Sequence, residues 1–163
     1  MYTYSIVPMT RSLRALAAIL TKAEAHCEER GIKPEALLTF RLFPDMMAFT
    51  RQVQLTCDFA ARASARLAGA EVPSFPDTET SFAELEGRIT AALAALTSHD
   101  KAAFDGADSR EVTLKIRGQD VTMTGQQFLS IYSLPQFYFH LTTAYNILRH
   151  NGVDLGKGDY MGV

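Results

Sequence analysis

The sequence predicts an all-α fold, a four-helix bundle with one short β-hairpin before its last helix. Two observations predict this fold. Four long segments repeat apolar residues every three or four positions, and one short segment near residue 115 alternates apolar and polar residues instead. The chain of 163 residues is long enough for a single domain, residues 1–163, with its own core. Four amphipathic helices bury their apolar stripes by packing together at about 20°.

The first helix is expected over residues 6–30. Pro8 falls within its first two turns, where a missing N–H costs little, and Gly31 suits the end of a helix. Residues 32–44 are expected to be a connector with one short turn after Pro34. The apolar stripe consists of Met9, Leu13, Leu16, Leu20, Ala23 and Cys27.

The second helix is expected over residues 44–68. Pro44 and Asp45 suit a first turn, by fixed φ and by charge against the helix dipole, and Gly69 follows the end. Asp58 and Arg62 are placed on the side away from the core, where they can pair at i, i+4. The stripe consists of Met46, Phe49, Val53, Cys57, Ala60 and Leu67.

A proline-bearing linker, residues 70–80, is expected to cross an end of the bundle. Ser81 and Glu84 then form a capping box that opens a third helix, residues 82–97. Acidic residues are common at a helix start, which accounts for Asp77, Glu79 and Glu84. The buried stripe consists of Phe82, Leu85, Ile89, Leu93 and Leu96.

Residues 110–125 change period from helical to alternating. Val112, Leu114 and Ile116 share one face, and the alternation resumes at residues 121 and 123 after the turn "RGQD", which predicts a β-hairpin. A lone hairpin is marginal in water, so its apolar face is expected to lie on the bundle.

The fourth helix is expected over residues 124–150. A second capping box, Thr124 with Gln127, opens it, and Asn151-Gly152 ends it. Pro135 removes one backbone hydrogen bond within this helix, which predicts a kink near residues 131–135.

Composition excludes several classes of protein. Hydrophobic residues make up 47% of the chain, and 16 basic against 18 acidic residues give a net charge of −2 without a basic cluster, which argues against nucleic-acid binding. Arg11 and Arg14 interrupt the first apolar run, unlike a signal peptide, and no stretch approaches the roughly 18 apolar residues of a membrane span. Cys27 and Cys57 read as buried reduced thiols, so a cytoplasmic protein is expected.

His140 lies in residues 136–153, where apolar and aromatic residues occupy nearly every side of the expected helix. Helical geometry places Gln136, His140 and Thr143 on one flank of the fourth helix, at the edge of the core. Two interpretations stay open for His140, a hydrogen-bonded packing residue or a ligand. Gln52 and Gln54 of the second helix could reach the same cleft, or could be exposed.

Aromatic residues cover the fourth helix on several sides. The bundle can bury only one side, so a partner subunit is expected to cover the face of Phe139, giving a homodimer. The alternative is that the hairpin and the tail after Gly152 cover Tyr138, Phe139 and Tyr145.

Three phrases resemble an uncharacterised, domain-of-unknown-function branch of the DinB-like (DinB/YfiT) superfamily: "RLFPDMMAFTRQVQ", "VPSFPDTETSFAEL" and "FYFHLTTAYNILRHNGVDLGKGDYMG". The resemblance implies an up-down-down-up four-helix bundle with a long crossover. Several members of the superfamily bind a divalent metal through three histidines, one on helix two and two on helix four. Some of them use the metal to activate thiols for transfer reactions.

This chain departs from that metal set. His140 matches one histidine of helix four, Gln136 stands where the other is found, and residues 44–68 contain no histidine. We therefore expect no metal cofactor and a non-catalytic cytoplasmic dimer that binds a small ligand or partner. Its ligand cleft is expected at His140, Gln136, Thr143 and Gln54. The alternatives are a thiol transferase with an altered zinc or nickel site that includes His140, and a purely structural interaction protein.

Overall fold

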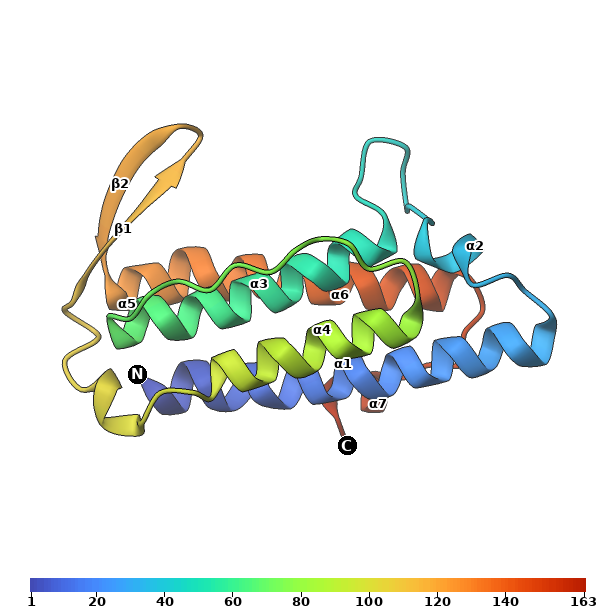
Figure 1. Cartoon of the computed structure of the whole chain (residues 1–163), viewed down its shortest axis with the longest axis horizontal. Coiled ribbons are helices and arrows are strands. Elements are labelled where there is room, and N and C mark those ends of the chain that lie inside the picture. Colours follow the sequence, from blue (N-terminus) through green and yellow to red (C-terminus); the bar gives the residue numbers. More distant parts are fainter.

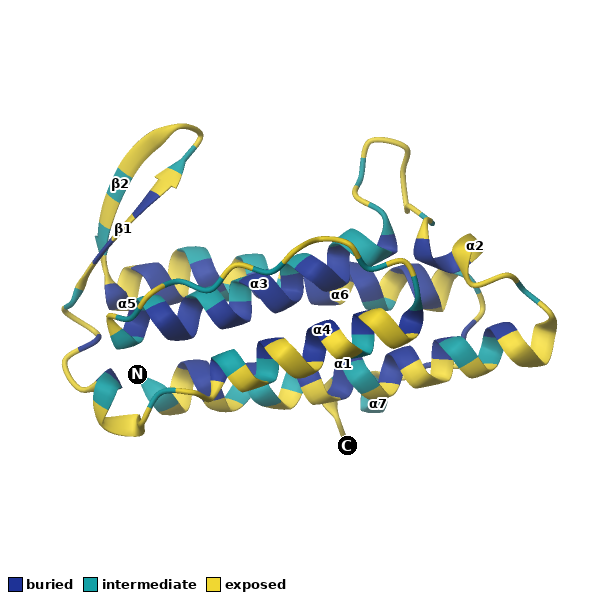
Figure 2. Ribbon diagram, viewed as in Figure 1, coloured by how far each residue is buried: buried dark blue, intermediate teal, exposed yellow.

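The computed structural model describes all residues, 1–163, as a mostly helical protein with one antiparallel hairpin. Four long helices lie alongside one another: α1 (Tyr2–Arg30), α3 (Phe49–Ala68), α4 (Phe82–Leu96) and α6 (Leu134–His150) (Figure 1). Their buried residues face inward and form the core (Figure 2). None of the helices has the length and apolarity that a membrane crossing requires.

Helix α1 begins at Tyr2, four residues before the expected start. Pro8 therefore lies inside the helix and withholds one hydrogen bond from the carbonyl of Tyr4. Tyr4 is exposed, so water can satisfy that carbonyl instead. Gly31 ends the helix in the left-handed conformation, and the expected turn after Pro34 is the short helix α2 (Glu35–Leu38).

Helix α3 begins at Phe49, and the expected start at Pro44 is wrong. Residues 44–48 are a turn followed by irregular backbone rather than a helix, and two contacts stabilise this segment. The amide of Phe49 donates to the carbonyl of Phe40 at 2.9 Å, and the guanidinium of Arg41 donates to the carbonyl of Met46. The fixed φ of a proline serves such a turn as well as it serves a first helical turn.

The linker after α3 runs back along the length of the bundle instead of crossing one end, so α4 begins near the end at which α3 begins (Figure 1). Ser81 caps α4 as expected and accepts the amide of Glu84 at 3.2 Å. The carboxylate of Glu84 accepts from the amide and hydroxyl of Thr80, one residue earlier than the expected partner.

The hairpin is confirmed as β1 (Glu111–Ile116) paired with β2 (Gln119–Thr124). Arg117 and Gly118 both have positive φ, as a two-residue type I′ turn requires. Only its base is buried, at Val112 and Leu114, while the tip extends away from the helices (Figure 1). Ile116 and Met123, farther along the apolar face, are half-buried and also pack against the core, so the expectation for this face is correct although the tip is free.

The last helix opens at the predicted capping box of Thr124 and Gln127, which forms the short helix α5 (Gly125–Gln127). A π-helical segment follows, Phe128–Ser133, and α6 begins directly before Pro135. The irregularity expected around residues 131–135 is therefore a π turn, whose i→i+5 pattern accommodates a residue without an N–H.

The tail after Gly152 returns to the bundle and forms helix α7 (Lys157–Met161). Asp159 pairs with Lys22 of α1 at 2.6 Å, and the hydroxyl of Tyr160 lies 2.8 Å from that of Thr142. Tyr160 also covers the ring of Tyr145 edge-on. The tail thus covers part of the aromatic surface, while Phe139 remains 57% exposed.

Candidate functional site

His140 of α6 is held by one glutamine of α3. Its Nδ1 lies 2.8 Å from Oε1 of Gln52, whose Nε2 donates to the carbonyl of Met47 at 3.1 Å. A carbonyl only accepts, so the amide of Gln52 must present its oxygen to the imidazole. Nδ1 therefore carries the hydrogen, and Nε2 keeps a lone pair with no protein partner.

Aromatic rings enclose the imidazole of His140. The ring of Phe59 stacks on it at 5.6 Å and 9°, and the ring of Phe139 meets it edge-on at 5.2 Å. His140 is 8% exposed, and this small exposure includes its Nε2, which makes no hydrogen bond within the protein but remains in contact with solvent. Burial, helped by the charge of Arg51, lowers the pKa of His140 to about 4. At neutral pH the side chain is thus an uncharged hydrogen-bond acceptor.

The other expected site residues lie at different distances from this imidazole. Gln136 is half-buried one turn earlier on α6, and the Thr143 hydroxyl donates to the carbonyl of Phe139 at 2.7 Å. Gln54 points elsewhere: its Nε2 donates to Glu79 at 2.8 Å, and its Oε1 accepts from Arg51 at 3.1 Å. The glutamine of α3 that reaches His140 is Gln52.

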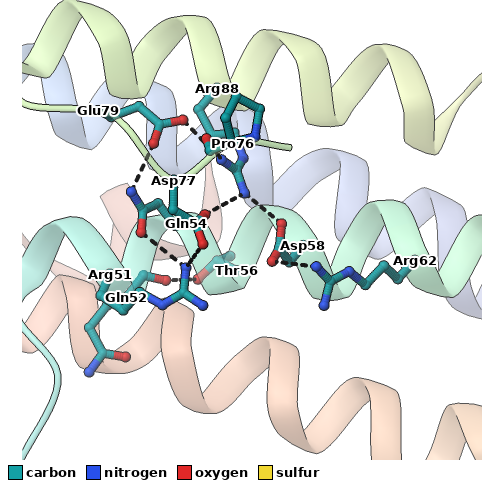
Figure 3. A network of polar contacts seen from close by, with 10 residues as sticks. All are labelled: Arg51, Gln52, Gln54, Thr56, Asp58, Arg62, Pro76, Asp77, Glu79 and Arg88. Carbon is teal, nitrogen blue, oxygen red and sulfur yellow. Dashed lines mark hydrogen bonds and ion pairs between the residues drawn. The ribbon is translucent and has the colours of Figure 1, made fainter. Parts of the chain in front are cut away.

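A network of charged side chains joins α3, the linker and α4 around Arg88 (Figure 3). One guanidinium nitrogen of Arg88 contacts Asp58 at 2.5 Å and Asp77 at 3.3 Å, and the other contacts Glu79 at 2.9 Å. It also donates to the carbonyl of Pro76 and lies 4.7 Å from the ring centroid of Phe75. Burial by itself would lower the pKa of Arg88, but its bonds to Glu79 and Asp58 raise it overall.

This network corrects two expectations. Asp58 pairs with Arg62 at 2.9 Å as predicted, but its carboxylate is buried rather than turned away from the core. Asp77 and Glu79 pair with arginines instead of facing the start of α4. Arg88 was missed, although its position three residues after Leu85 and four before Ala92 places it on the buried stripe. Because every carboxylate here has an arginine partner, the network ties segments together and leaves no free acid.

The surface hollows lie either beside the neighbours of His140 or farther away. The largest, about 820 Å³, is an open groove along α1 beside the C-terminal tail. Two smaller ones adjoin the neighbours of His140: about 240 Å³ beside Gln136 and Phe139, and about 250 Å³ beside Phe59 and Tyr132.

Comparison with known proteins identifies the family. Residues 1–161 match the family described as Domain of unknown function (DUF1993). The chain belongs to this family. A crystal structure described as a DinB family member protein from Shewanella denitrificans shares 40% sequence identity and superimposes with a TM-score of 0.93, over 99% of this chain and 92% of that one. No curated protein matches the chain.

These matches confirm the resemblance seen in the sequence: the chain belongs to a domain-of-unknown-function branch, DUF1993, of the DinB-like superfamily. The residues at His140 do not fit the three-histidine metal set of that superfamily. Both amide atoms of Gln52 are already bonded, and nowhere do three histidine, cysteine or acidic side chains come together as metal ligands. Burial raises the pKa of the Cys57 thiol to about 12, so the thiol stays protonated at neutral pH.

Proposed function

We propose that this DUF1993 protein binds a small organic molecule without turning it over, through a hydrogen bond to Nε2 of His140. The observation behind this proposal is the fixed tautomer of His140. Because Nδ1 donates to Gln52, the lone pair of Nε2 is left without a protein partner. A neutral acceptor beside the rings of Phe59 and Phe139 favours a hydroxyl or thiol donor on an apolar body. Gln136 and Thr143 lie on the same flank of α6 and would border the ligand.

Three observations support binding over catalysis. The carboxylates nearest to α3 are neutralised by arginines, and the Cys57 thiol is buried and protonated. His140 itself, with a pKa of about 4, is a weak base at neutral pH.

The proposal includes a DinB-like up-down-down-up bundle in a cytoplasmic homodimer. The linker that returns along the bundle supports this order of helices (Figure 1). Phe139 and Ile131 are 57% and 68% exposed and flank a hollow of about 240 Å³ with Pro135, which supports a subunit contact on this face.

Ligand-observed NMR with benzyl alcohol and benzyl mercaptan tests the His140 proposal. We expect saturable binding to the native protein, loss of binding in His140→Ala, and retention in His150→Gln, which alters an exposed histidine. Thermal melting confirms that each variant is folded. Equal binding by His140→Ala, or none by the native protein, contradicts the proposal.

A second candidate is a metal-dependent thiol transferase with an altered ligand set. The contact that favours it is the bond from Nδ1 of His140 to an amide oxygen, since metal-binding histidines are commonly oriented through their second nitrogen. Elemental analysis of untagged protein separates the two. About one equivalent of zinc, nickel, iron or manganese per chain, lost in His140→Ala, would favour the transferase.

A further inference from the structure

A pocket of about 250 Å³ lies where α3, the base of the hairpin and the π segment meet. Leu114 of β1 is buried there, although the hairpin tip extends away from the helices. Nine residues line it: Phe59, Arg62, Ala63, Arg66, Leu114, Lys115, Phe128, Tyr132 and Ser133.

The wall of this pocket carries positive charge and no acidic residue. Arg62 shares the carboxylate of Asp58 with Arg88, and Lys115 pairs with Asp120 on the exposed face of the hairpin. Arg66 has no ion pair. Burial and the neighbouring charge of Arg62 lower the pKa of Arg66, as expected for a guanidinium that lacks a counter-charge.

Ser133 supplies an unpartnered hydroxyl. The residue is 1% exposed, and its Oγ is sealed from solvent without a hydrogen bond. Ser130 of the same π segment instead donates to the carbonyl of Gln126 at 2.8 Å, the usual solution for a helical serine. A buried polar group without a partner is costly, so an acceptor bound in the pocket that Ser133 lines would relieve this cost.

The rest of the wall is aromatic. The ring of Tyr132 lies 6.1 Å from that of Phe59 and 6.0 Å from that of Phe128. A ligand that fits must therefore combine an anionic head with a flat or apolar body, and the volume limits it to a small molecule.

We propose that this pocket binds a small organic anion, a phosphate monoester or carboxylate on an apolar body. Arg66, with Arg62 and Lys115, would bind the head, because a guanidinium matches both anions with two parallel hydrogen bonds. The hydroxyl of Ser133 would donate to the same head, and Phe59, Phe128 and Tyr132 would enclose the body. The proposal does not depend on the function of His140, which stacks on the Phe59 ring but does not line this pocket.

Titration by isothermal calorimetry and by NMR of the arginine Nε–H groups tests this proposal. The probes are benzyl phosphate, phenylacetate, inorganic phosphate and neutral benzyl alcohol. We expect either organic anion to bind at least about tenfold more tightly than inorganic phosphate and to shift the Arg66 signal, whereas benzyl alcohol leaves that signal unchanged. The tighter of the two anions identifies the head group.

Two variants and a control locate the binding. Arg66→Gln should weaken the preferred anion by about tenfold or more, and Ser133→Ala, which changes little in shape, by several-fold. Arg30→Gln removes an exposed arginine at the end of α1 and should leave the affinity within about twofold. The proposal is overturned if neither anion binds, if benzyl alcohol shifts Arg66 equally, or if folded Ser133→Ala and Arg66→Gln both bind like the native protein.

Discussion

Replacing Arg88 by methionine should be among the most destabilising changes outside the apolar core. Arg88 is buried and holds Asp58 at 2.5 Å, Glu79 at 2.9 Å and the carbonyl of Pro76 at 2.9 Å. Methionine can fill much of the same space, but it leaves the buried carboxylate of Asp58 with Arg62 as its sole partner.

The expected magnitude follows from burial. Removing one member of a buried ion pair costs about 3–5 kcal/mol, because the other charge stays in a poorly solvated site. That is a large fraction of the roughly 5–15 kcal/mol by which domains of this size are stable. Arg62→Met removes a partly exposed arginine from the same carboxylate and should cost about 1 kcal/mol or less, so it is the matched control.

Urea unfolding at pH 7, followed by circular dichroism, measures both variants. With a slope of about 2 kcal/mol per molar, Arg88→Met should lower the midpoint by about 2 M. Adding Asp58→Asn to Arg88→Met should recover part of the loss, since the stranded charge is then gone. A loss below about 1 kcal/mol in Arg88→Met, or equal losses in Arg88→Met and Arg62→Met, would refute the reasoning.

Three further predictions concern other parts of the chain. The pKa of His140 is about 4 in the folded protein and ordinarily 6.5, so between these pH values the unfolded state binds one more proton than the folded state. The free energy of unfolding should therefore fall by up to about 3 kcal/mol as the pH is lowered from 6.5 to 4, with no effect above pH 6.5. Urea unfolding at several pH values should show a smaller fall in His140→Gln, and an equal fall in the variant and the native protein would contradict this. Phe139→Glu should weaken a dimer on that face, and identical sedimentation equilibrium of variant and native protein would argue against the contact. Gly125→Ala places a Cβ 1.8 Å from the carbonyl oxygen of Ala107 and should lower the free energy of unfolding by about 2 kcal/mol or more. Gly87→Ala lies on the exposed face of α4 with open space around it and should raise the free energy of unfolding by about 0.5–1 kcal/mol. Thermal melts that rank the two variants in the opposite order would contradict this account.

The helices and the hairpin were predictable because their signals are local. Apolar spacing, the capping residues Ser81 and Thr124, and the alternation around Leu114 depend on residues a few positions apart. The start of α3 was not predictable in this way. Pro44 suits both a helix and a turn, and the choice depends on Phe40 and Arg41, which bond across the turn.

The contacts of the candidate site were harder to predict because they join distant segments. The sequence placed His140 at the edge of the core, but helical spacing could not decide which glutamine of α3 would meet it. Only the rotation of α3 against α6 selects Gln52 and turns Gln54 toward Glu79. The partners of Arg88 lie up to 30 residues away, so its burial could be inferred from the stripe but its partners could not.

The π segment, Phe128–Ser133, also sets the angular phase between the two ends of the last helix. Its wider loop of backbone encloses one residue more than an α turn does. Deleting a single residue there would restore ordinary α winding and leave the two ends in nearly the same orientation, because the wider turn spreads the same rotation over one more residue. Deleting a residue from an ordinary turn of α6 would instead rotate one end against the other by about 100° and turn His140 out of the core. The π segment is therefore the part of the last helix in which the loss of one residue disturbs the bundle least.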